Sequence, residues 1–311
     1  MKIALLYGGR SAEHEVSLVS AAGVLHALQS VSRYDVTPIG ISRDGAWYRQ
    51  DLEAQLTATR ESGALTIEET ADEIAVVPGR GLSLRRDTSV SLRTDCAFPV
   101  LHGSFGEDGT VQGLLETANI PYVGAGVVGS AVGMDKLRSK QLWERHNLPV
   151  VPYLTIRRDD EATPTQQEER LVEEIRSSFG FPVFIKPNAA GSSVGVTRVT
   201  EPSGVAVALE GAFAVDPFVL VEQALSVREI ETAVLGNYRV RSFPPGEVVP
   251  THEFYDYEAK YVDPDGADLA IPAEITAEQA AEIGRISREA FRAVDATGMA
   301  RVDCFIENGT G

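Results

Sequence analysis

The sequence has few cysteines and no long apolar segment. Only Cys96 and Cys304 are present among 311 residues, and each lies in an apolar, strand-like run. We therefore expect buried free thiols in a reducing compartment and no disulfide. No segment approaches the ~18 consecutive apolar residues of a membrane-spanning helix. Met1-Lys2 leads directly into an apolar strand, without the features of a secretory signal peptide. These absences predict a cytoplasmic protein.

Positive charge is also scarce, because 28 Lys and Arg face 45 Asp and Glu, which gives a net charge of −17. This charge repels the phosphates of nucleic acids and of anionic membranes, so we expect neither as a partner. A phosphate-bearing ligand must then be held by local lysines, backbone N–H groups and metal ions. With 43% hydrophobic residues the chain should still form a large core, and its length allows two or three domains.

The most informative stretch runs from Phe181 to Val199. An apolar strand ends in Lys186, a loop of small residues follows, and a second strand begins with apolar residues from Val194 onward. Gly191 and Gly195 have no side chain to block close approach, so the loop leaves backbone N–H groups open to an anion. Together with the lysine, this hairpin is suited to binding a polyphosphate.

Two other interpretations of the same residues stay open at this point. Gly191-x-Ser193-x-Gly195 fits the nucleophile elbow of serine hydrolases, with His252 as the histidine downstream. The elbow needs a strand-to-helix turn, whereas the residues after it are β-branched and alternate in polarity. The plainer interpretation is an ordinary hairpin with a solvated lysine.

The chain opens with the pattern of a parallel α/β sheet. A strand from Ile3 to Tyr7 runs into a Gly8-Gly9 turn, and apolar residues at helical spacing follow. The turn lacks the Gly-x-Gly-x-x-Gly spacing of dinucleotide sites, so a nicotinamide cofactor is not implied. Glu13 lies near the helix start, where capping is the alternative to a ligand role. His102 follows a second buried strand, beside the glycine turn, and could be structural or ligand-binding.

Other segments divide the chain. Residues 43–94 are polar with little periodicity, and we interpret them as a variable insertion. Residues 157–169 read as a charged loop. We expect three domains, at 1–125, 126–219 and 220–311. In the last one, the aromatic and charged residues 254–261 predict a loop that closes over a ligand.

The final strand, Met299 to Ile306, alternates cleanly in polarity. Asn308-Gly309 then gives the strongest short hairpin signal. A hairpin turn without a return strand would leave an exposed edge of unpaired N–H and C=O groups. We therefore expect the sequence to be truncated after Gly311.

Several signatures occur together and in order along the chain. They are Gly8 to Ser17, Leu101 to Gly109, Met134-Asp135-Lys136, Lys186-Pro187 to Val196, Tyr255 to Tyr261, and Met299 to Asp303. In this ordered set the chain resembles the D-alanine:D-alanine ligase family of ATP-grasp enzymes. The resemblance covers the whole length except residues 43–94.

The resemblance implies an α/β ATP-grasp fold, with an N-terminal Rossmann-like parallel-sheet domain and two α+β domains that sandwich the nucleotide. It implies a homodimer that phosphorylates one D-alanine with ATP to an acylphosphate and joins a second D-alanine to it, for peptidoglycan synthesis. Two Mg²⁺ ions, replaceable by Mn²⁺, would accompany the nucleotide. Related activities remain as alternatives, namely a ligase for D-lactate or D-serine, and a non-catalytic nucleotide-binding relic.

Nucleotide contacts implied by the resemblance fall at matching positions. Lysines would hold the phosphates, the serine loop would cover them, and residues after a buried strand would bind adenine and ribose: Lys136, Lys186, Lys260, Ser193, Glu222, Gln223, Ala224, Leu225, Glu229 and Phe254.

The substrate contacts implied by the resemblance come from several parts of the chain. Glu13, Ser192 and Tyr261 would form a hydrogen-bonded trio around the first D-alanine, and His102 would lie near its carboxylate. Arg301 would stabilise the oxyanion of the tetrahedral intermediate. Tyr261 favours D-alanine as the second substrate.

Asp303 is the one metal ligand that the resemblance assigns. The family's return strand carries a Glu-x-Asn pair that completes the metal site, and this sequence has no such strand. We therefore expect the 311-residue chain to be inactive as written.

Overall fold

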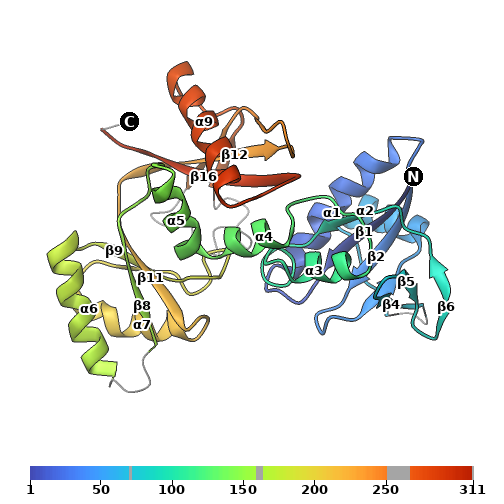
Figure 1. Ribbon diagram of the computed structural model, residues 1–311, viewed down its shortest axis with the longest axis horizontal. Helices are drawn as coiled ribbons and strands as arrows, with labels where there is room; N and C mark the ends of the chain where they lie inside the picture. The colour runs from blue at the N-terminus through green and yellow to red at the C-terminus, as the bar shows by residue number, and fades with distance from the viewer. Residues whose placement is uncertain (70–71, 159–163, 251–266, 310–311) are drawn as a thin grey trace. The chain divides into compact units, whose positions relative to one another are not determined.

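The computed structural model describes residues 1–69, 72–158, 164–250 and 267–309 (Figure 1). The chain divides into two compact units, Met1–Ala131 and Val132–Gly311. Helix α4 (Val127–Met134) contains the boundary between them. Among the described residues, none of the helices is long and apolar enough to cross a bilayer.

The first unit is built on one seven-stranded sheet in the order β6-β5-β4-β3-β2-β1-β7. Strand β1 pairs in parallel with both β2 and β7, and the remaining pairings are antiparallel. The predicted parallel pairing is thereby confirmed for β2, β1 and β7, within a sheet that is mixed as a whole. Its elements are β1 (Lys2–Gly8), α1 (His14–Gln29), β2 (Asp35–Ile41), β3 (Trp47–Arg49), α2 (Leu52–Ser62), β4 (Glu73–Val77), β5 (Gly81–Leu84), β6 (Asp87–Leu92), β7 (Cys96–Val100) and α3 (Thr110–Thr117).

Both faces of β1 are covered, as expected of a strand with parallel neighbours on both sides. Leu5 and Tyr7 pack in one core cluster with the buried residues of α1. Leu6 packs on the opposite face with Leu115 of α3. The carboxyl end of β1 is therefore held rigidly from both sides, which fixes the glycine turn that follows it.

Residues 43–94, which we interpreted as a variable insertion, are an integral part of the first unit. This segment forms β3, α2, β4, β5 and β6, and its strands extend the main sheet by antiparallel pairing. Ile74 and Leu82 from it lie in the same core cluster as Leu6. The segment shows little periodicity because its strands are short and β6 is almost wholly exposed.

The second unit contains two sheets. The four-stranded sheet has the order β10-β9-β11-β8, and helices α6 and α7 pack against one of its faces. The other sheet has the order β13-β12-β14-β15, with β16 paired to β12. The elements are α5 (Lys136–Arg145), β8 (Tyr153–Arg157), α6 (Pro164–Ser178), β9 (Val183–Pro187), β10 (Thr197–Val199), η1 (Pro202–Gly204), α7 (Val205–Phe213), β11 (Phe218–Gln223), β12 (Val227–Leu235), β13 (Arg241–Ser242), β14 (Gly246–Pro250), β15 (Ala267–Ala270), α9 (Ala277–Ala293) and β16 (Met299–Glu307).

Several predictions for this unit are confirmed. Strands β9 and β10 form the expected antiparallel hairpin, although β10 begins only at Thr197. Strand β16 alternates in burial as predicted, and Ile306 packs with Ile283 of α9. The loop expected at residues 157–169 is partly wrong, because α6 already begins at Pro164. A surface helix rich in charged residues carries little apolar signal at its start.

Both cysteines are free thiols, as predicted, and both are partly buried. Burial raises the pKa of Cys96 and of Cys304 above the ordinary thiol value. Such thiols are mostly protonated at neutral pH and are poor nucleophiles.

Candidate functional site

In the first unit, Glu13 and the loop that begins with His102 lie together at the carboxyl end of the parallel strands. Glu13 is 8% exposed, and a Cβ added to Gly103 would lie 2.3 Å from its Oε2 atom. The Ser11 hydroxyl donates to the carbonyl of His102 at 2.7 Å and ties the two turns together. The Glu13 side chain does not form an N-cap hydrogen bond to α1. Its buried carboxylate lies beside the turn that begins with His102.

A cavity of about 440 Å³ opens in this unit beside the same turns. His102 lines the cavity, and its Nε2 atom lies 3.1 Å from the Ser20 hydroxyl. The guanidinium of Arg10, another lining residue, stacks 4.5 Å from the ring centre of Phe105. The cavity lies at the carboxyl ends of parallel strands, where ligands bind in α/β sheets.

In the second unit, alternation along β9 and β11 places Lys186 and Glu222 on one face of the four-stranded sheet. Val183 and Ile185 pack with α6 and α7 on one face, so Lys186 points to the other. Lys186 pairs with Leu220 in the register, which makes Glu222 its diagonal neighbour. Their side chains form an ion pair.

A third member of this group, Lys140, was not predicted. The Lys140 ammonium lies 2.8 Å from Oε1 of Glu222, while Lys186 contacts Oε2. The signal for it was the spacing Lys136, Lys140, Glu144 on α5, since residues four apart share one face of a helix. That spacing alone does not identify a partner, because Glu222 is remote in sequence.

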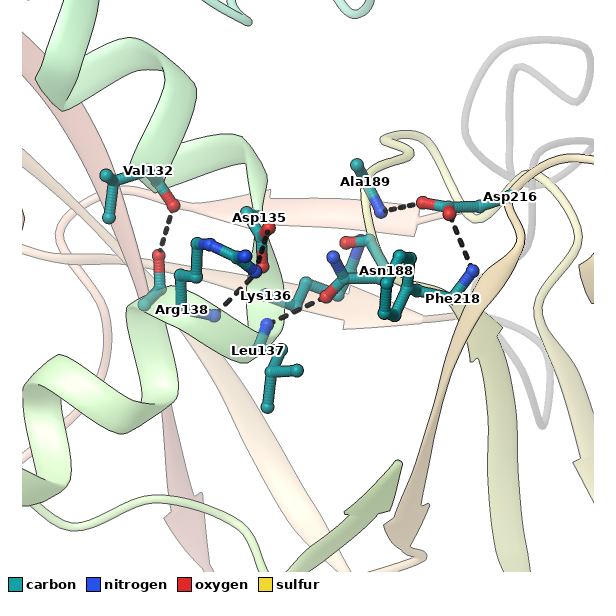
Figure 2. Close-up of polar contacts among 10 residues, drawn as sticks. Val132, Asp135, Lys136, Leu137, Arg138, Asn188, Ala189, Asp216 and Phe218 are labelled. Carbon is teal, nitrogen blue, oxygen red and sulfur yellow. Dashed lines mark hydrogen bonds and ion pairs between the residues drawn. The ribbon is translucent and has the colours of Figure 1, made fainter. Parts of the chain in front are cut away.

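Residues 188–196, which connect β9 to β10, form a loop that we call the glycine-serine loop. Lys136 contacts the start of this loop (Figure 2). Its ammonium donates to the carbonyls of Ala190 at 2.5 Å and Asn188 at 3.2 Å. The Asn188 side chain accepts from the backbone N–H of Leu137 at 2.8 Å. Asp216 anchors the other side of the loop, because its carboxylate accepts from the N–H of Ala189 at 2.8 Å. The loop is therefore tied at its base to α5.

Burial and mutual charge shift the pKa values of these groups. Burial, and after it the charge of Lys186, lowers the pKa of Lys136 to about 8. Burial likewise lowers the pKa of Lys140, against the opposing effect of Glu222. For Glu222 burial raises the pKa, but Lys186 and Lys140 together outweigh it and leave the pKa below the ordinary value. A cationic cluster beside a loop of backbone N–H groups can bind a polyphosphate.

The loop itself adopts left-handed backbone at Ser192 (φ 50°), Ser193 (φ 55°) and Gly195 (φ 71°). It runs in turns into strand β10 and not into a helix. The nucleophile-elbow interpretation of Ser193 is therefore wrong, since that motif requires the strand-to-helix turn. Its other member, His252, lies outside the described residues.

Two backbone donors at the end of β11 are already used within the protein. The N–H of Gln223 donates to the carbonyl of Pro152, and the N–H of Ala224 donates to that of Pro182, both at 3.1 Å. Leu225 follows directly, and Glu229 lies partly buried on β12. This segment connects the two sheets of the second unit.

On β16, Arg301 and Asp303 form a bidentate ion pair at 2.7 and 2.9 Å. Arg301 also lies 3.4 Å from Glu231 of β12. Both members of the pair are more than half exposed. Among the described ranges, no group of three or more His, Cys, Asp or Glu could hold a metal ion. The described residues thus offer Asp303 but not a complete set of metal ligands.

The structure brings some of the predicted residues together within each unit. Glu13 lies beside the turn that begins with His102 in the first unit, and Lys136, Lys186 and Glu222 lie together in the second. Three predicted residues, Phe254, Lys260 and Tyr261, lie outside the described residues.

Comparisons with known proteins agree along the whole chain. Residues 2–125 match the family model described as D-ala D-ala ligase N-terminus, and residues 142–311 match D-ala D-ala ligase C-terminus. A protein named D-alanine-D-alanine ligase from Treponema denticola is 41% identical over 100% of this chain and 84% of its own length.

Solved structures agree as well. The VanG D-Ala:D-Ser ligase from Enterococcus faecalis has a TM-score of 0.81 and 34% identity, covering 99% of this chain and 86% of its own. The D-alanine-D-alanine ligase from Coxiella burnetii has a TM-score of 0.80 and 30% identity, over 100% and 82% of the two chains.

Proposed function

We propose, because this chain belongs to the D-alanine-D-alanine ligase family, that it joins two D-alanine molecules in an ATP-dependent reaction that serves cell-wall synthesis. The fold class predicted from the sequence is that of the solved ligases it resembles. The observation that carries the proposal is the convergence of Lys136 and Lys186 beside the glycine-serine loop. The chain has a net charge of −17, so a local cluster of cations is what allows it to bind a polyanion.

The reaction has two steps. An oxygen of the first D-alanine carboxylate attacks the γ-phosphorus of ATP, the bond to the bridging oxygen breaks, and ADP leaves. The amine of the second D-alanine then attacks the acylphosphate carbon, phosphate leaves, and the nitrogen loses a proton. The first step needs cations to spread the charge of the transferring group, and the second needs donors for an oxyanion.

The phosphate contacts are assigned to the second unit. Lys136 and Lys186 hold the nucleotide phosphates, and Ser192 and Ser193 present hydroxyl and N–H donors from the loop. Lys136 exchanges the carbonyl oxygens that it now contacts for phosphate oxygens. Lys260 is assigned to the transferring group from the resemblance alone.

The adenine edge is assigned to the segment after β11. Because the N–H groups of Gln223 and Ala224 are used within the protein, the N–H of Leu225 is the backbone donor that we assign to the base. Glu222 contributes its carboxylate, Glu229 binds the ribose, and Phe254 contacts the ring, as the resemblance implies.

The first D-alanine is assigned to Glu13 and His102. The buried carboxylate of Glu13 takes the substrate ammonium, and His102 lies near the substrate carboxylate. The resemblance adds Ser192 and Tyr261 to this group. Arg301 stabilises the oxyanion, and its bidentate contact with Asp303 orients the guanidinium.

The family implies ATP and a divalent cation. We propose Mg²⁺ as that cation, arriving with the nucleotide, with Asp303 as one carboxylate ligand. The described residues do not complete a metal site, so no catalytic step is assigned to the ion. We propose a homodimer that works in the cytoplasm, where its substrate ATP is present. Division into domains at 1–125, 126–219 and 220–311 remains our proposal.

A coupled ADP-release assay on the full-length protein tests this function. We expect ADP release with D-alanine and none with L-alanine. A full-length protein that binds ATP but releases ADP with none of these amino acids would contradict the ligase. The same assay on residues 1–311 alone tests the separate expectation that this sequence is inactive as written.

D-serine is the second candidate for the attacking substrate. One similar solved structure is a D-Ala:D-Ser ligase, although its identity of 34% is lower than the 41% of the curated D-alanine relative. Including D-serine and D-lactate in the assay separates these activities. We expect the highest kcat/KM with D-alanine.

A further inference from the structure

Glu222 is a buried carboxylate with two lysine partners. Its side chain is 8% exposed, and each of its oxygens contacts one ammonium group, Lys140 at Oε1 and Lys186 at Oε2. The proposed function uses Lys186 for the nucleotide phosphates and leaves Lys140 without a role. Two counter-ions on one carboxylate therefore need an explanation.

The two lysines are held very differently. Lys140 is 9% exposed, donates to the carbonyl of Val151 at 3.1 Å and lies 5.1 Å from the ring centre of Tyr153. The Tyr153 hydroxyl in turn donates to Glu144 on the same helix at 3.1 Å. Lys140 is thus fixed by Glu222, by a backbone carbonyl and by an aromatic ring.

Lys186 has fewer contacts than Lys140. Its side chain is 19% exposed, and within the described part of the chain its ammonium has Glu222 as its one hydrogen-bond partner. It extends from β9 next to the glycine-serine loop, where a polyphosphate would lie. Lys186 is therefore the partner that a ligand can draw away.

Removal of one partner from a buried ion pair leaves an uncompensated charge, which is strongly unfavourable. If Lys186 were the only counter-ion of Glu222, nucleotide binding would have to bear that cost. Because Lys140 stays in contact with the carboxylate, the charge of Glu222 remains compensated when Lys186 moves.

We propose, resting on the proposed function, that Lys140 is a positioning residue: it is the permanent counter-ion of Glu222 and thereby releases Lys186 to the phosphates of the nucleotide. Lys140 itself touches neither substrate nor nucleotide. It acts through Glu222 alone, and this distinguishes it from a third phosphate-binding lysine.

A double-mutant cycle tests this on the full 311-residue chain, with Lys140→Met, Glu222→Gln and both together. The probe is inorganic tripolyphosphate, which has no base, so the role assigned to Glu222 toward adenine does not enter. Calorimetry gives its Kd, and ATP is titrated into the wild type for reference. Arg145→Met, an exposed cation on the same helix, is the matched control.

We expect Lys140→Met to bind tripolyphosphate about tenfold more weakly, the size of effect of one charge-assisted hydrogen bond. Arg145→Met should match the wild type. In the Glu222→Gln background, Lys140→Met should have no effect, because no carboxylate remains to retain Lys186. This comparison needs only the Glu222→Gln and double variants, so it holds even if Lys140→Met alone does not fold.

Two results would overturn the inference while leaving the proposed function intact. In the first, the wild type binds ATP, and all four variants bind tripolyphosphate with the same Kd as the wild type. The other is an equal loss from Lys140→Met in both backgrounds, which would make Lys140 a direct phosphate ligand. A wild type that binds neither ATP nor tripolyphosphate would overturn both proposals.

Discussion

The ammonium of Lys136 lies 2.5 Å from the backbone carbonyl oxygen of Ala190, so a lysine on helix α5 holds the first turn of the glycine-serine loop. The carbonyl of Asn188 is its second acceptor. Both contacts supply oxygen atoms to a buried cation, as phosphate oxygens would. The positions of the loop and of the lysine are therefore linked. A ligand that bound the Lys136 ammonium in place of these carbonyls would also remove two hydrogen bonds from the loop.

The pKa of Lys136 predicts how ATP affinity depends on pH. Burial and then the charge of Lys186 lower that pKa to about 8, so the ammonium is charged below pH 8 and neutral above it. ATP affinity should be nearly constant below pH 7.5 and fall by up to about tenfold per pH unit above 8. Calorimetric titrations from pH 6.5 to 9.5 measure this. Lys136→Met should bind more weakly at pH 7 and lose this dependence; a parallel slope in both proteins would contradict the assignment.

Gly195→Ala should destabilise the second unit. The residue has φ of 71°, and an added Cβ would lie 2.9 Å from the ring of Pro187. We expect a loss of about 1–3 kcal/mol in the free energy of unfolding and a higher KM for ATP. Urea denaturation measures the first and steady-state kinetics the second.

Gly211→Ala is the control for Gly195→Ala. It lies inside helix α7 with nothing within 4 Å of an added Cβ, and it should stabilise by about 0.5–1 kcal/mol. Equal stability of the two variants would show that the loop backbone is not constrained as described.

Gly103→Ala should weaken D-alanine use without affecting ATP. The added Cβ would lie 2.3 Å from Oε2 of Glu13, so the carboxylate must move. We expect KM for D-alanine to rise about tenfold or more, as for loss of one charged hydrogen bond. Kd for ATP should stay unchanged, since the nucleotide is assigned to the other unit.

The matched control for Gly103→Ala is Gly23→Ala on helix α1, where an added Cβ meets nothing within 4 Å. A rise in KM for D-alanine in both variants, or a loss of ATP binding in Gly103→Ala, would argue against the role of Glu13.

Arg301→Lys should remove catalysis and leave stability nearly unchanged. A lysine cannot reproduce the fork of donors that now grips Asp303, and loss of one oxyanion donor costs about 10²–10³ in kcat. Because Arg301 is 61% exposed, its ion pair adds little to folding, and thermal melting should show that. Arg285→Lys, an exposed arginine with two ion pairs on α9, should keep full kcat. Similar kcat values for both variants would remove Arg301 from the mechanism.

Regular elements were predictable because their periodicity survives in the chain. Strand β1 is apolar from Ile3 to Tyr7, and β16 alternates in burial. Residues 43–94 were not predictable in the same way. Their strands are short and partly exposed, and antiparallel pairing through backbone hydrogen bonds needs no particular side chains. The start of α6 was hidden for a similar reason, because charged residues dominate its surface.

Residue types and their order along the chain established the family and predicted the parallel strands of the first unit. The resemblance that they carry led us to propose Lys136 and Lys186 for the nucleotide phosphates and Glu222 for the adenine edge. Tertiary structure alone decided that Lys140 shares Glu222 with Lys186, and that Lys136 is tied to the loop it serves. The physical reason is that a buried charge interacts with the groups within a few ångströms of it, and the fold decides which groups these are. The spacing of the lysines on α5 does not show that Glu222 of β11 will lie beside Lys140.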